Sequence, residues 1–190
     1  MPTSQEPVTA AQGTPADRVV PMLDGEAIER ARRAAATPGE AAAEALWRQG
    51  LVKLLNDALA TELVCVLRYK RHHYTAHGLA SPRIAEEFAV HAAEEMAHAD
   101  RLARRIVQLG GAPDFAPDTL SARSHVPYDG AAGLKAMIAS NLSAERVAIE
   151  SYGQLVRLVG TRDPSTRRLL EDILADEQKH AEELLGWLTE

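Results

Sequence analysis

The sequence contains little cysteine and few aromatic residues, and both shortages restrict the fold. Cys65 is the only cysteine among 190 residues. A single cysteine allows no internal disulfide and excludes a metal site built from four cysteines. Aromatic residues make up 4% of the chain, whereas alanine and leucine are abundant. This composition suits helices packed on helices better than a β-sandwich, and the length allows one domain with a sizeable core.

The sequence also lacks an excess of basic residues and any long apolar run. Acidic residues outnumber basic ones by 27 to 21, which gives a formal net charge of −6. This balance argues against a general nucleic-acid binder, because neutralising phosphates requires a basic surface. No window is long enough to span a membrane without charges, and residues 1–21 lack the basic start and apolar segment of a signal peptide. We therefore expect a cytoplasmic protein with no membrane or nucleic-acid partner.

The distribution of proline and glycine divides the chain into a tail and a helical domain. Residues 1–40 are predicted to form a flexible tail, in which Asp24 can cap a short helix over about 25–36. Pro38-Gly39 is expected to break that helix. Residues 41–190 are predicted to form the folded domain. Its long helical patterns cover about residues 41–77 (or 47–77), 81–109, 131–159 and 163–190.

The links between these patterns predict how the helices pair. The first and second patterns are separated by a short link, as are the third and fourth, so each pair is expected to form an antiparallel hairpin. The link between the second and third patterns, about residues 110–130, is long enough to cross a bundle. It contains Pro113, Pro117 and Pro127. The sequence therefore predicts an all-α four-helix bundle in which one long crossover joins two hairpins.

Each helical pattern carries acidic or imidazole side chains in the middle of an otherwise apolar stripe. At three- and four-residue spacing the stripes are apolar near their ends. The residues that interrupt them are Glu62, Glu95, His98, Glu145, Glu177 and His180. Burying one unpaired carboxylate costs several kcal/mol, and no lysine or arginine lies on these stripes. Two divalent cations would balance four glutamates and two neutral histidines, so the pattern predicts two metal ions.

The spacing of these six residues repeats in the two halves of the chain. In each half a Glu and a His lie three residues apart, so both side chains project from one helix face. The remaining glutamate lies 33 residues before the first pair and 32 residues before the second. One Glu-x-x-His would be weak evidence, because these residues are common on solvated faces. Two copies with matched upstream glutamates form the ligand set of ferritin-like di-iron bundles.

Four stretches of the sequence resemble the main helices of bacterioferritin, over about residues 45–188. They are LNDALATELVCVLRY (55–69), EEMAHAD (94–100), NLSAERVAIESY (141–152) and DEQKHAEELLGWL (176–188). The resemblance implies a ferritin-like fold that binds two iron ions per subunit. It also implies a ferroxidase that oxidises Fe(II) with O2 or H2O2 for iron storage or detoxification.

The resemblance further implies a role for individual residues. It assigns terminal carboxylate ligands to Glu62 and Glu145, bridging ligands to Glu95 and Glu177, and one iron each to His98 and His180. Tyr69 matches a tyrosine near the di-iron site of the family, and it also suits a core aromatic. Met96 matches the methionine that binds haem across a twofold dimer interface, and packing of a haem-free interface is the alternative.

The sequence departs from bacterioferritin at its end, because only ten residues follow His180. The fifth helix of the large bacterioferritin cage is therefore not expected. We expect a dimer-based homo-oligomer, either a smaller cage such as the dodecamers of Dps-like proteins and mini-bacterioferritins, or a simple dimer.

Two other functions and two other residues stay open at this point. A peroxide-reducing protein resembling rubrerythrin is disfavoured by the missing rubredoxin-like cysteines. A non-catalytic bundle that binds DNA or a partner is disfavoured by the acidic balance and the Glu/His pattern. His91 shares a stripe with the predicted ligands, and it binds a transit iron, tunes the site or is simply hydrogen-bonded in the core. Glu94 is a candidate iron-binding residue or an ordinary exposed glutamate.

Overall fold

The computed structural model describes residues 23–34, 38–77 and 81–189, and within these ranges every regular element is a helix. The helices are α1 (Gly25–Ala34), α2 (Pro38–Thr75), α3 (Ser81–Gln108), α4 (Leu120–Arg123), α5 (Leu134–Val159) and α6 (Pro164–Thr189). The predicted all-α class is confirmed. The predicted flexible segment before residue 23 lies outside the described residues and stays a prediction.

The structure divides into two compact units between Ala43 and Glu44, three residues after the predicted boundary. α1 belongs to the first unit, and Asp24 Oδ1 accepts a 3.0 Å hydrogen bond from the Ala27 N–H at its start, as expected for a cap. α1 ends at Ala34, and Pro38 and Gly39, which were predicted to break a helix, are the first two residues of α2. Proline suits the first turn of a helix, where its missing N–H would have no partner.

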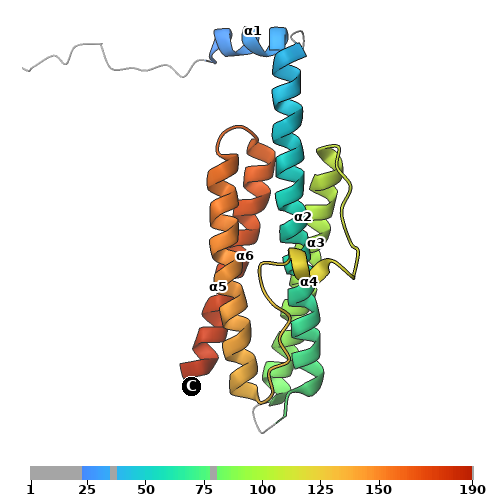
Figure 1. Ribbon diagram of the computed structural model, residues 1–190. Coiled ribbons are helices and arrows are strands. Elements are labelled where there is room, and N and C mark those ends of the chain that lie inside the picture. The colour runs from blue at the N-terminus through green and yellow to red at the C-terminus, as the bar shows by residue number, and fades with distance from the viewer. Residues whose placement is uncertain (1–22, 35–37, 78–80, 190) are drawn as a thin grey trace, which may run out of the picture. The chain divides into compact units, whose positions relative to one another are not determined.

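The second unit is a four-helix bundle (Figure 1). α2 and α3 form one antiparallel hairpin, α5 and α6 form the other, and the crossover between α3 and α5 runs along α2. Within the described residues no helix is both long enough and apolar enough to cross a membrane.

The crossover differs from the prediction in two details. It contains the short helix α4, and α5 begins at Leu134 rather than near Ala131. Gly133, which precedes α5, has a φ of +89°. This conformation is outside the α region and is readily adopted only by glycine, so the helix cannot extend back to Ala131.

Side chains of α2 hold the crossover in place. The Asn56 side chain donates a 3.1 Å hydrogen bond to Ala112 O and accepts a 2.8 Å bond from the Asp114 N–H. The buried Arg68 donates a 2.7 Å bond to Pro127 O. These bonds satisfy backbone groups in the parts of the crossover outside α4 and fix its path along the bundle.

The core of the bundle has an apolar cluster on either side of a polar middle. One cluster is built around Leu55, Leu102 and Ile173, and the other around Phe88 and Leu184. The predicted stripes are buried along their length, except that Ile84 and Leu134 near their ends are half-buried. The polar middle is therefore enclosed by the bundle, and this position decides its chemistry.

Candidate metal centre

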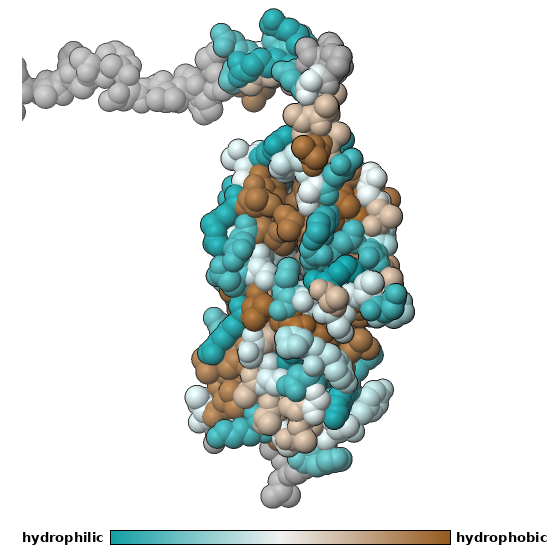
Figure 2. Space-filling view, in the orientation of Figure 1, coloured by the Kyte–Doolittle hydropathy of each residue, from teal (hydrophilic) through white to brown (hydrophobic). Residues whose placement is uncertain are grey.

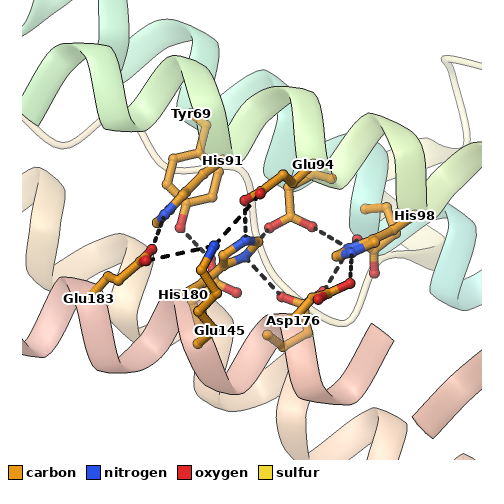
Figure 3. Close-up of polar contacts among 12 residues, drawn as sticks. Tyr69, His91, Glu94, His98, Glu145, Asp176, His180 and Glu183 are labelled. Atoms are coloured by element: carbon orange, nitrogen blue, oxygen red, sulfur yellow. Dashed lines mark hydrogen bonds and ion pairs between the residues drawn. The ribbon is translucent and has the colours of Figure 1, made fainter. Parts of the chain in front are cut away.

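The six predicted ligands lie on four helices and converge on the middle of the bundle, and Figure 3 labels three of them, His98, Glu145 and His180. α2 supplies one glutamate, α5 supplies another, and α3 and α6 each supply one Glu-x-x-His pair. None of the six residues is more than 2% exposed. The structure therefore brings together all six residues that the stripe pattern selected.

These side chains form two groups that share two members. One group is Glu62, Glu95, His98 and Glu177, and the other is Glu95, Glu145, Glu177 and His180. In each group one potential ligand atom per residue lies within 4.8 Å of the others. Two groups of four donors with two carboxylates in common are the geometry of two adjacent metal positions bridged by two carboxylates.

The two shared glutamates point one oxygen toward each histidine. Glu95 Oε2 lies 3.4 Å from His98 Nδ1, and Glu95 Oε1 lies 3.4 Å from His180 Nδ1. Glu177 repeats this, with Oε1 at 3.1 Å from His98 Nδ1 and Oε2 at 3.7 Å from His180 Nδ1. Two donor atoms that bind one metal ion at about 2.1 Å, at right angles to each other, lie about 3.0 Å apart. The nitrogen–oxygen distances here are comparable to that value. All four oxygens are buried without a hydrogen-bond partner, as expected of bridging ligands.

Glu62 and Glu145, the two glutamates that belong to one group only, are the unshared glutamates. Each of them has one oxygen that is held by a tyrosine and one that is not. Tyr152 Oη donates a hydrogen bond to Glu62 Oε1, and Tyr69 Oη donates one to Glu145 Oε1. The Oε2 atom of each glutamate is buried without a hydrogen-bond partner. Each tyrosine therefore orients a carboxylate so that a single oxygen faces the site, which suits a terminal ligand.

The outer nitrogens of both predicted histidine ligands are held by carboxylates of the facing helix. His98 Nε2 lies 3.1 Å from Asp176 Oδ2, and His180 Nε2 lies 2.7 Å from Glu94 Oε2. A carboxylate accepts a hydrogen bond, so these contacts place the proton on Nε2 of each imidazole. The lone pair of Nδ1 then faces the site, and both Nδ1 atoms are buried without a hydrogen-bond partner.

Without metal ions, the cluster of buried glutamates is electrostatically unfavourable. Burial, and then the charges of Glu177 and Glu95, raise the pKa of Glu62 well above its usual value, and the same causes raise the pKa of Glu145. Burial opposes a charge on His180, but the neighbouring Glu177 and Glu95 outweigh it and raise its pKa to about 10. Protons therefore occupy the cluster in the absence of cations, and metal ions would displace them.

The donor set fits two divalent cations. Within the described part of the chain, the ion pairs of these four glutamates involve only histidines. No lysine or arginine within ion-pair distance compensates the buried carboxylates, so cations at the shared centre are the physical solution. Carboxylate oxygens and imidazole nitrogens together suit iron or manganese.

Comparison with known proteins agrees with this geometry. A family model described as a ferritin-like domain matches residues 52–190. The chain belongs to the ferritin-like family. The match includes every residue of the candidate centre, and it leaves out the first unit and the first residues of the bundle unit.

Individual relatives of this ferritin-like chain are about 30% identical to it. The bacterioferritin of Desulfovibrio desulfuricans is 30% identical over 131 residues, which are 68% of this chain and 69% of that protein. A nutrient stress-induced DNA-binding protein of a Synechococcus strain is 30% identical over 137 residues, which are 70% of this chain and 78% of that protein.

A solved structure supports the same fold. The bacterioferritin-related protein of Bacteroides fragilis, described as a dodecameric thioferritin, superimposes with a TM-score of 0.73 and 30% identity. The superposition covers 75% of this chain and 86% of that protein.

Several residues around the centre of this ferritin-like chain were not among the predicted site residues. Tyr152 is the counterpart of Tyr69, and a repeat could have indicated it, since each tyrosine lies seven residues after an unshared glutamate. Glu94 and Asp176 also form a repeat, because each directly precedes a shared glutamate. Glu94, considered above as a candidate iron-binding residue, contacts His180, and its binding of iron stays a prediction.

Met96 is 39% exposed on α3, and it lies about 100° around the helix from its neighbour Glu95, so the two side chains do not share a face. Its role in haem binding stays a prediction.

His91 is fully buried, and its Nε2 lies 2.9 Å from Glu183 Oε2. Burial lowers the pKa of His91, which favours the neutral imidazole.

Proposed function

We propose that this ferritin-like chain is a di-iron ferroxidase, which binds two Fe(II) ions and oxidises them with O2 or H2O2 for iron storage or detoxification. The observation that carries the proposal is the pair of buried carboxylates, Glu95 and Glu177, shared by two groups of four donors. A purely structural polar cluster has no need of two carboxylates whose four oxygens all lack hydrogen-bond partners.

Each side chain has a distinct part in this proposal. Glu62 and Glu145 are the terminal carboxylate ligands, oriented by their tyrosines. Glu95 and Glu177 hold the two ions close together, and His98 and His180 each bind one ion through Nδ1. Fe(II) is the substrate, and the four negative charges of the carboxylates favour its product, Fe(III).

The reaction balances with either oxidant. With H2O2, two Fe(II) and two protons give two Fe(III) and two water molecules. With O2, two Fe(II) and two protons give two Fe(III) and one H2O2. Close placement of two Fe(II) ions suits a two-electron step, because both electrons are available at one point.

We also propose that the chain forms a homo-oligomer. Exposed apolar side chains occur on α2, α3, α5 and α6, and examples are Leu67, Val90, Leu158 and Leu185. Figure 2 shows apolar patches between hydrophilic residues on the visible face of the bundle. Such patches suit contacts with further copies of the chain, and the B. fragilis relative is described as dodecameric. The mass of the present protein in solution would distinguish a dodecamer from a dimer.

Haem binding at a dimer interface is a separate part of the proposal. Met96 is partly exposed on the surface of α3, where a second copy could bring an equivalent methionine near it. Packing of a haem-free interface explains the same exposure. A Soret band in the purified protein would indicate haem, and its absence would favour packing alone.

DNA binding is not favoured by the described residues. One relative is named as a DNA-binding protein, but this chain carries a net charge of −6. The arginines of α1 are partly neutralised, because Arg30 pairs with Asp24 and Arg32 pairs with Glu29. Phosphate binding requires basic groups that are free of acidic partners.

The proposal predicts accelerated Fe(II) oxidation with a defined stoichiometry. The metal-free protein is loaded anaerobically with Fe(II) and then mixed with O2 or H2O2, and Fe(III) formation is followed by absorbance. We expect a rapid phase that oxidises two Fe(II) per chain, well above the rate in buffer. Rapid oxidation by H2O2 without accumulation of stored Fe(III) would favour the rubrerythrin-like alternative. A rate equal to that in buffer would contradict both enzymes.

A further inference from the structure

A third buried histidine lies beside the candidate centre. His91 is on α3, one helical turn before Glu95, and its side chain is 1% exposed. Its Nε2 lies 2.9 Å from Glu183 Oε2 on the facing helix α6, as Figure 3 shows. Its Nδ1 is buried without a hydrogen-bond partner.

This arrangement is the same as that of the two predicted histidine ligands. In His98 and His180 the Nε2 atom is also held by a carboxylate of the facing helix, and the Nδ1 atom is also buried without a partner. A carboxylate on the outer nitrogen of an imidazole is the usual support of a metal-bound histidine. A buried polar nitrogen without any partner is otherwise rare, because it loses its hydrogen bond to water on folding.

The position of His91 restricts which metal ion it could reach. Its ring stacks on the ring of His180, with centroids 4.2 Å apart and planes inclined by 23°. Ligand atoms of His91, Glu145 and His180 all lie within 4.8 Å of one another. The His91 nitrogen that is available to bind a metal ion is Nδ1, since Nε2 contacts Glu183.

The other half of the bundle has no equivalent donor. His91 lies four residues before Glu95, and the residue four positions before Glu177 is Ile173. Ile173 is fully buried and belongs to an apolar cluster. The internal repeat is therefore broken at this position, and the break adds a nitrogen on one side only.

We propose that His91 is a seventh protein ligand, which binds through Nδ1 the metal ion held by Glu145 and His180. This inference rests on the proposed di-iron function. The metal ion held by Glu62 and His98 keeps four protein donors, whereas its neighbour has five. The two metal positions are therefore chemically unequal, and the position with the additional nitrogen retains divalent ions more strongly.

The test is an anaerobic titration of the metal-free protein with Co(II), followed by visible absorption. The wild-type protein is expected to bind two Co(II) ions per chain. In His91→Gln one of the two dissociation constants is expected to rise about ten-fold or more, with a changed spectrum for that step only. Ile173→Val alters the equivalent position of the other half and is the matched control, for which both constants should stay at the wild-type values.

The outcomes separate the two proposals. A wild-type protein that binds fewer than two Co(II) ions would overturn the di-iron function itself. Wild-type binding of two ions, with unchanged constants and spectra in His91→Gln, would overturn the role of His91 alone.

A second measurement on the wild-type protein does not depend on the folding of a variant. Proton NMR of the Co(II)-loaded protein reveals the Nε2–H protons of metal-bound imidazoles as strongly shifted signals that disappear in D2O. Three such signals are expected if His91 binds a metal ion along with the other two histidines. Two signals would contradict the proposal.

Discussion

Replacement of a shared carboxylate, in the variant Glu177→Gln, is expected to decrease the rate of Fe(II) oxidation by at least about 100-fold. Glu177 belongs to both groups of donors, and its two oxygens point toward different histidines. The amide of glutamine has nearly the same shape but supplies no negative charge. Loss of groups that only support a ligand already costs about 10- to 100-fold in metal affinity or activity, so loss of a shared ligand should cost more.

The control for this variant is Glu182→Gln, which makes the same change at an exposed position of α6. It should oxidise Fe(II) at the wild-type rate. Glu62→Gln is informative as well, because Glu62 belongs to one group only, and it should weaken one of two metal-binding steps. Equal activity of Glu177→Gln and Glu182→Gln, measured as the initial rate of Fe(III) formation, would refute the shared-carboxylate geometry.

Removal of metal ions by a chelator is expected to lower the melting temperature by about 5–10 °C. The folded bundle gathers the donors, whereas an unfolded chain does not, so metal binding stabilises the folded state. At a free metal concentration of about 100 times the dissociation constant this stabilisation is about 2.7 kcal/mol, and a domain of this size changes Tm by about 2–4 °C per kcal/mol. Differential scanning calorimetry with and without metal measures the shift.

The same experiment on a variant separates binding at the centre from binding elsewhere. In Glu95→Gln the metal-dependent increase should be much smaller, because both metal positions lose a donor. The increase is measured for each protein against its own metal-free form, because Glu95 also pairs with His98 and His180 and its replacement changes the metal-free stability as well. An equal increase in Tm for Glu95→Gln and the wild-type protein would indicate that the stabilising ions bind elsewhere.

The fold and the six central residues could be predicted because helical periodicity determines which side chains face the core. An acidic residue such as Glu62 in the middle of an apolar stripe can be recognised as a candidate metal ligand, since burial without a counter-charge is unfavourable. The repeat of Glu-x-x-His then indicates how the halves meet. All six predicted residues are buried in one cluster.

The surroundings of the centre could not be predicted in the same way. Asp176 and Glu183 lie beside the apolar stripe of α6, and both are partly exposed. Periodicity alone therefore does not select them. Their contacts with His98 and His91 depend on how α3 and α6 are rotated against each other. The start of α5 was also missed, because the φ of Gly133 is set by the path of the crossover rather than by local sequence.

The central claim is that the two halves of the chain form one site for two metal ions. Anomalous diffraction at the iron edge, from crystals loaded with Fe(II) without oxygen, tests it most directly. We expect two peaks about 3.5–4 Å apart, both in contact with Glu95 and Glu177. A single peak, or iron bound only on the surface of the bundle, would contradict the account.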